Sequence, residues 1–140
     1  MIGQLRTQLV GYISVHAYGQ YILVPFGDHA VDRPGNYLEL LRVGQQCLAT
    51  IERATHSKWT LMKSFSIYNE SAIGTSDDWA ASIGIEYSYG IELYPNEFGE
   101  NGFYIQEDEI PFPAAQLYWF FIGFAKATAR NRLRWGYRRI

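Results

Sequence analysis

The chain has 140 residues, of which 48% are hydrophobic and 19% are charged, and its formal net charge is −2. That length suits one domain with its own core, and the composition is close to that of ordinary globular chains, which excludes global disorder. The slight negative charge gives no general argument for a nucleic-acid partner.

The first 24 residues contain two predicted strands but no recognisable signal peptide. Gln4, Arg6 and Gln8 interrupt the stretch where a signal peptide needs an unbroken apolar run. The short segments Tyr12–Val15 and Tyr21–Val24 are apolar and rich in β-branched or aromatic side chains. That composition is typical of buried strands.

A helix is predicted to begin at Asn36, after a Pro-Gly break, and to end near Thr55. Asn36 and Glu39 have the spacing of a capping box, in which each side chain accepts a hydrogen bond from a free backbone N–H of the first turn. Cys47 falls within the helical pattern, where a buried apolar thiol is a better interpretation than a nucleophile. As the single cysteine, it also excludes an internal disulfide and a thiolate zinc cluster.

Three more elements are predicted between residues 66 and 93. A short strand at Ser66–Tyr68 precedes a loop, and Ser76 with two following aspartates marks the start of a short helix that ends at Gly84. The clearest strand is Glu86–Leu93, where aromatic and aliphatic side chains alternate with small or polar ones. This alternation predicts that the two faces of the strand have different surroundings.

A final helix is predicted from about Ala114 to Ala129. Its apolar run, Leu117–Ala125, is too short to cross a bilayer, so no transmembrane segment is expected. Residues 130–140 contain five arginines, which indicate a solvated basic tail or, as a sharper alternative, a contact with phosphate or a membrane surface. Strands that alternate with helices predict an α/β fold with a mixed, largely parallel sheet flanked by helices, without repeats or a second domain.

Two polar residues lie at the ends of apolar strands. His16 directly follows the first strand, and Glu92 lies near the end of the clearest one. A lone histidine in such a place is commonly structural, whereas a carboxylate on a buried strand is costly unless it is paired or functional. Because open α/β sheets bind ligands beyond the carboxyl ends of their strands, His16 and Glu92 are candidate site residues.

Six segments stand in a specific order along the chain: Ile13–Gln20, Pro25–Gly27, Ile67–Tyr68, Gly74–Ala80, Gly84–Leu93 and Asn101–Ile105. In that order they resemble the M14 family of zinc metallocarboxypeptidases. The resemblance covers nearly everything from about Leu9 to Ala129. It implies that residues 1–129 are the C-terminal portion of a peptidase M14 catalytic domain and that residues 130–140 are a basic tail.

The resemblance also implies roles for individual residues. His16 matches a protein ligand of the zinc ion, and Glu92 matches the carboxylate that acts as general base on the zinc-bound water. Tyr68 matches a mobile tyrosine that closes over the C-terminal residue of the substrate. Asp77 matches the base of the pocket for that residue's side chain, and Tyr18 matches a tyrosine beside the scissile bond. The expected substrates are the C-termini of peptides or proteins.

Part of the family's zinc site has no counterpart in this sequence. The resemblance implies two further ligands from a His-x-x-Glu segment upstream of His16, and no such segment is found. His29 and Asp32 have metal-like spacing but fall where the family has no ligand. We therefore expect a truncated carboxypeptidase chain with one zinc ligand; the alternative is an inactive short relative that binds peptides or has no function. The family is mostly secreted.

Two finer expectations depend on the same resemblance. The carboxylate of Asp77 would favour substrates that end in Lys or Arg, because it can pair with their positive charge. An apolar C-terminal side chain would instead face an unpaired carboxylate. The loop between Tyr68 and Trp79 is about two residues longer than in the family's digestive enzymes, so Asp77 could instead cap the following helix. The peptide bond between Ala17 and Tyr18 is expected to be cis.

Overall fold

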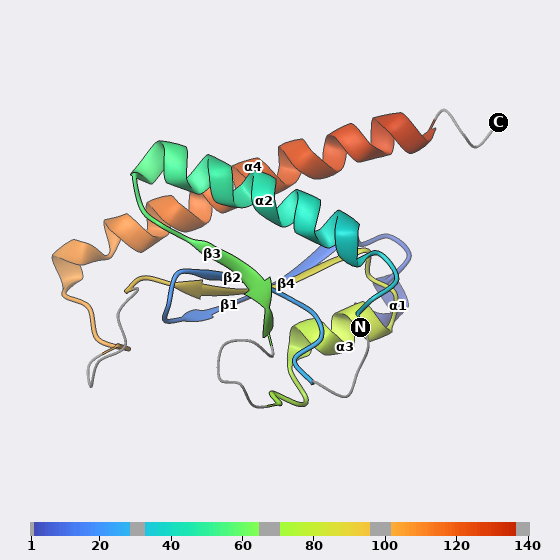
Figure 1. Ribbon diagram of the computed structural model, residues 1–140, viewed down its shortest axis with the longest axis horizontal. Coiled ribbons are helices and arrows are strands. Elements are labelled where there is room, and N and C mark those ends of the chain that lie inside the picture. Colours follow the sequence, from blue (N-terminus) through green and yellow to red (C-terminus); the bar gives the residue numbers. More distant parts are fainter. Residues whose placement is uncertain (1, 29–32, 65–70, 96–101, 137–140) are drawn as a thin grey trace.

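The computed structural model describes residues 2–28, 33–64, 71–95 and 102–136, the last six by their backbone alone. Four strands form one sheet, and the longer helices lie against it (Figure 1). In chain order the elements are α1 (Ile2–Leu5), β1 (Gly11–Ala17), β2 (Tyr21–Val24), α2 (Tyr37–Thr55), β3 (Thr60–Lys63), α3 (Ser76–Ser82), β4 (Tyr87–Leu93), the 3-10 turn η2 (Glu107–Glu109) and α4 (Pro111–Gly136).

The sheet is mixed and has the strand order β1-β4-β2-β3. β1 pairs with β4 and β2 pairs with β3 in parallel, while β2 and β4 are antiparallel. Parallel neighbours need a long crossover, and α2 supplies it between β2 and β3. The predicted α/β class with a mixed, largely parallel sheet is therefore confirmed.

The helices divide between the two faces of the sheet. α2 and α4 lie side by side on one face, and α3 lies on the other (Figure 1). β4 shows why, because its side chains alternate as predicted. Tyr87, Tyr89 and Ile91 join the hydrophobic core beneath α2 and α4. Ser88 instead points to α3, where its Oγ donates a hydrogen bond to the carbonyl of Asp77 at 2.7 Å.

The predicted start and end of α2 agree with the structure, but the predicted capping box is wrong. Asn36 precedes the helix without a side-chain capping bond, and its Nδ2 donates to the carbonyl of Glu86 at 2.5 Å. Glu39 accepts a bidentate hydrogen bond from Arg42. Asn36 thus bonds to a residue far away in the sequence, and Glu39 bonds to Arg42 in the next turn of its own helix. Cys47 is fully buried, as predicted, and burial raises the pKa of its thiol to about 12.

Two other elements differ from expectation. β3 was not predicted, because four residues with a Thr and a Lys at their ends carry too little periodicity to mark a strand. α4 begins earlier, at Pro111, because proline is tolerated in the first turn of a helix. It also continues to Gly136, so the start of the basic segment is helical. The predicted strand Ser66–Tyr68 lies outside the described residues.

None of the described helices combines the length and the apolar character that crossing a membrane requires.

Candidate active site

A small cavity lies at the carboxyl ends of β1 and β4, on the face that α3 covers. The two strands are parallel and in register, so His16 stands beside Glu92. His16, Asp77 and Glu92 all line the cavity, which has a volume of about 160 Å³. Its wall is completed by Leu23, Ser64, Ala72, Thr75 and Gly90. Three residues that are far apart in the sequence, and that were singled out from it, therefore meet around one space.

Glu92 is partly buried, and its carboxylate has few hydrogen-bond partners among the described residues. Within the described residues, Oε2 is buried and has no hydrogen-bond partner. Burial, and to a smaller extent the negative charge of Asp77, together raise the pKa of Glu92 to about 7. A carboxyl group with a pKa near neutrality can accept and return a proton at physiological pH.

Asp77 is in the first turn of α3 and is only 6% exposed. It does not cap the helix: Thr75 precedes the first turn, and Asp77 is directed toward the cavity. Among the described residues, no lysine or arginine forms an ion pair with Asp77 or Glu92. The cavity therefore brings two carboxyl groups together without a cation.

Gly90 leaves the space that Asp77 and the cavity occupy. A Cβ atom at Gly90 would lie 3.3 Å from Cβ of Leu23 and 3.6 Å from Oδ2 of Asp77. Any larger side chain would project into the cavity lining. The sequence analysis did not single out Gly90, although its place on the polar side of β4, between Ser88 and Glu92, was a usable signal.

Asp78, the next residue of α3, binds the backbone of another loop. Its Oδ2 accepts a hydrogen bond from the backbone N–H of Gly27 at 2.8 Å, which ties α3 to the loop after β2. Burial raises the pKa of Asp78, and the hydrogen bond from Gly27 opposes that effect.

His16 is exposed, and one of its ring nitrogens is engaged by a serine pair. Nε2 lies 2.5 Å from Oγ of Ser14, whose Oγ in turn accepts a hydrogen bond from Ser76 at 3.1 Å. Nδ1 is therefore the ring nitrogen turned away from this pair. A metal-bound histidine typically uses its second nitrogen for such a contact, which holds the ring in place. Neither serine was singled out from the sequence.

Tyr18 is not among the described residues that line the cavity. The ring of Tyr18 packs edge-to-face on Phe103, with 5.0 Å between the ring centroids, and against the backbone of Gly102. The peptide bond between Ala17 and Tyr18 is cis, as expected. Tyr68 lies outside the described residues.

The donor atoms at the cavity match only part of a catalytic zinc site. Such a site takes three protein ligands and leaves one position open. Within the described part of the chain, no group of three His, Cys, Asp or Glu residues could hold a metal ion. His29 and Asp32 lie outside that part. The imidazole of His16 fits one ligand position, and Glu92 lies beside it on the neighbouring strand.

Comparisons with known proteins connect this arrangement to one family. The sequence model described as zinc carboxypeptidase matches residues 1–119. The chain is similar to carboxypeptidase O of Bos taurus, with 35% identity over 105 residues, which is 75% of this chain and 27% of that protein. It is 36% identical to carboxypeptidase B2 of Rattus norvegicus over 107 residues, 72% of this chain and 23% of that protein.

Solved structures agree. Bovine thrombin-activatable fibrinolysis inhibitor, in complex with tick carboxypeptidase inhibitor, superposes with a TM-score of 0.82 at 27% identity, over 93% of this chain and 43% of that one. For carboxypeptidase A from Helicoverpa armigera the TM-score is 0.78 at 26% identity, over 92% of this chain and 32% of that one. The chain thus spans about a quarter of the length of the curated relatives it matches.

Proposed function

The chain belongs to the zinc carboxypeptidase family, and we propose that it is the C-terminal portion of a zinc-dependent domain that removes C-terminal residues from peptides. The observation that carries this proposal is the meeting of His16, Asp77 and Glu92 around one cavity at the carboxyl end of the sheet. The remaining zinc ligands then come from a His-x-x-Glu segment outside these 140 residues. The family also supports an extracellular location.

In this proposal His16 is a zinc ligand and Glu92 is the general base. Zinc, when bound, polarises the scissile carbonyl and lowers the pKa of the attacking water. Glu92 takes a proton from that water onto its carboxylate and then transfers it to the departing amine. A pKa near 7 suits both transfers, since the group loses and regains a proton at little cost. Ser14 holds the ring of His16 through Nε2.

Asp77 is proposed to select the residue that is removed. A buried carboxylate in the cavity would pair with the cation of a C-terminal Lys or Arg. Such a cation would also offset the electrostatic repulsion between the carboxylates of Asp77 and Glu92. Substitution of Asp77→Asn should then reduce the preference for Lys over Phe at least about tenfold, because a desolvated charge pair is lost. Equal cleavage of both substrates before substitution would refute this selectivity.

A chimeric enzyme tests the proposal most directly. Residues 1–119 of this chain would replace the matching segment of bovine carboxypeptidase O, which supplies the rest of a catalytic domain. We expect one bound zinc ion and release of C-terminal residues that a chelator abolishes. The matched Glu92→Gln variant should keep its zinc but lose turnover, because an amide cannot accept the proton.

The second candidate is a non-catalytic relative that binds peptide C-termini. It is favoured by the donor set of the described residues, which includes one imidazole at the cavity but no complete metal site. A folded chimera that binds C-terminal peptides but holds no zinc and hydrolyses nothing would select this candidate. By itself the 140-residue chain should not hydrolyse peptides under either candidate.

A further inference from the structure

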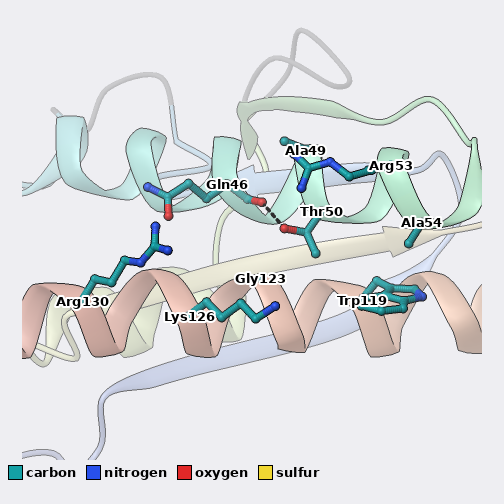
Figure 2. Close-up of a pocket in the computed structure, with 9 residues that line it drawn as sticks. All are labelled: Gln46, Ala49, Thr50, Arg53, Ala54, Trp119, Gly123, Lys126 and Arg130. Carbon is teal, nitrogen blue, oxygen red and sulfur yellow. Dashed lines mark hydrogen bonds between the residues drawn. The ribbon is translucent and has the colours of Figure 1, made fainter.

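A second concave surface lies far from the cavity, on the side of α2 and α4 that faces away from the sheet. It is a groove with a volume of about 590 Å³ (Figure 2). Residues on one face of each helix line it: Gln46, Ala49, Thr50, Arg53 and Ala54 from α2, and Trp119, Gly123, Lys126 and Arg130 from α4. Family membership assigns no role to it, and two of its three cations lie beyond residue 119, where the family match ends.

The floor of the groove is built by a close helix contact. A Cβ atom at Gly123 would lie 2.9 Å from Cα of Cys47 and 3.1 Å from Oγ1 of Thr50, so only glycine lets α4 approach α2 here. Oγ1 of Thr50 donates to the carbonyl of Gln46 at 2.7 Å and so stays folded against its own helix (Figure 2). The groove is therefore a feature of the packed helices, and the close contact at Gly123 forms its floor.

The charge of the groove is one-sided. Arg53, Lys126 and Arg130 are all exposed, and the lining contains no Asp or Glu. None of these three cations forms an ion pair within the described residues, whereas Arg42 on the same helix α2 is paired with Glu39. This local excess of three positive charges contrasts with a chain whose formal net charge is −2. An anion would therefore be attracted to this surface.

The carboxylate nearest in sequence does not compensate the groove. Glu52 precedes Arg53, but its Oε1 accepts a hydrogen bond from the backbone N–H of Trp59 at 3.1 Å. Glu52 is thus committed to the connection between α2 and β3, on another side of the helix.

The two ends of the groove differ in chemistry, one being aromatic and the other basic. Trp119 lies at one end, near Ala54, whereas Arg130 reaches toward Gln46 at the other end (Figure 2). On α4, Lys126 and Arg130 are about 6 Å apart along the axis, and Trp119 and Arg130 are about 16 Å apart. An indole can stack with a planar ring, and the cations can bind several phosphate oxygens. A single inorganic ion would occupy only part of this length.

We propose that the groove between α2 and α4 binds an organic polyphosphate that carries an aromatic ring, of the nucleotide class. The ring would lie against Trp119, and the phosphates would lie between Arg53, Lys126 and Arg130. A concave groove favours such a ligand over a bilayer, which would need a flat or convex basic surface. The inference does not depend on peptidase activity, since the groove and the cavity lie on opposite faces of the sheet.

The test uses the full 140-residue chain and ATP as the probe. Calorimetry should show saturable one-to-one binding that weakens as salt is added, because exposed charges are screened. Tripolyphosphate should compete with ATP, and adenosine should bind more weakly than ATP. In a nitrogen-15 NMR spectrum, the indole signal of Trp119 should shift on addition of ATP.

Matched variants localise the site. Arg53→Gln, Lys126→Gln and Arg130→Gln together should weaken ATP binding about tenfold, because exposed charge contacts contribute modestly but add up. A triple variant with the same change of charge elsewhere, Arg6→Gln, Arg33→Gln and Lys58→Gln, should weaken it less than about twofold. All six positions are exposed, and circular dichroism will verify that both variants fold.

Four results would overturn the inference. They are no saturable ATP binding, equal loss in the two triple variants, loss that follows only neutralisation of Arg132, Arg134, Arg138 and Arg139, and binding of anionic phosphatidylserine vesicles in place of ATP.

Discussion

The two faces of β4 use alternate residues of one strand for opposite purposes. Toward α2 and α4, the ring of Tyr89 is fully buried, and its hydroxyl donates to the carbonyl of Leu40 at 2.7 Å. Toward α3, Gly90 leaves space, and Glu92 has a buried oxygen with no partner among the described residues. One face is packed with aromatic and aliphatic side chains, while the other is left partly open with like charges close together. Alternate residues of the strand thus face the hydrophobic core and the candidate site.

The largest effect is expected where the filled face is emptied. Tyr89→Ala should lower the free energy of unfolding by about 3–5 kcal/mol, because it leaves a cavity among packed rings. Tyr89 lies 6.4 Å from Phe120 and 6.3 Å from Phe124, measured between ring centroids. Urea unfolding of the 140-residue chain measures the loss. As a control, Tyr89→Phe should cost only about 1 kcal/mol, the contribution of one hydrogen bond. Equal losses in both variants would show that the hydroxyl, rather than packing, dominates this face.

A smaller effect of opposite sign is expected on the open face. The pKa of Glu92 is raised from 4.5 to about 7, so the folded chain holds this proton more tightly than the unfolded chain. The contribution of Glu92 to stability is therefore fully present below pH 4.5 and is lost as the pH rises to about 7. Glu92→Gln should remove that loss and stabilise the metal-free chain by about 1–3 kcal/mol at pH 8, an amount reduced by the partial exposure of the group.

Urea titrations at several pH values between 5 and 8 measure this difference. The exposed Glu86→Gln substitution, just before the same strand, is the matched control for the loss of one carboxylate. If both variants follow the wild-type pH dependence, folding does not raise the pKa of Glu92.

The smallest effect should come from a single satisfied hydrogen bond on the open face. Ser88→Ala removes the hydrogen bond to the carbonyl of Asp77 and should cost about 1 kcal/mol. Because that bond joins β4 to α3, hydrogen exchange should speed up in α3 and remain unchanged in α2. A uniform acceleration across both helices would instead indicate that the two faces unfold as one unit.

Local sequence patterns predict several elements of this molecule. The alternation in Glu86–Leu93 correctly separated the two faces of β4, and helical spacing correctly placed most of α2. The alternation of strands with helices predicted the fold class, the positions of His16 and Glu92 at strand ends made them candidate site residues, and the order of the family segments predicted the family. These features depend on residues close in sequence or on a resemblance that spans the chain, so they can be read without coordinates.

Tertiary structure decided what contacts between distant residues control. Asn36 bonds to Glu86 instead of capping its own helix, because a carbonyl on another element lies within reach. The strand order places His16 beside Glu92, and α3 then brings Asp77 over Gly90. The groove between α2 and α4 has no local signature either, because Arg53 is more than 70 residues away from Lys126 and Arg130 and joins them only when the helices pack. Sequence patterns thus determined which residues are candidates for a site, and packing between elements determined which of them lie together.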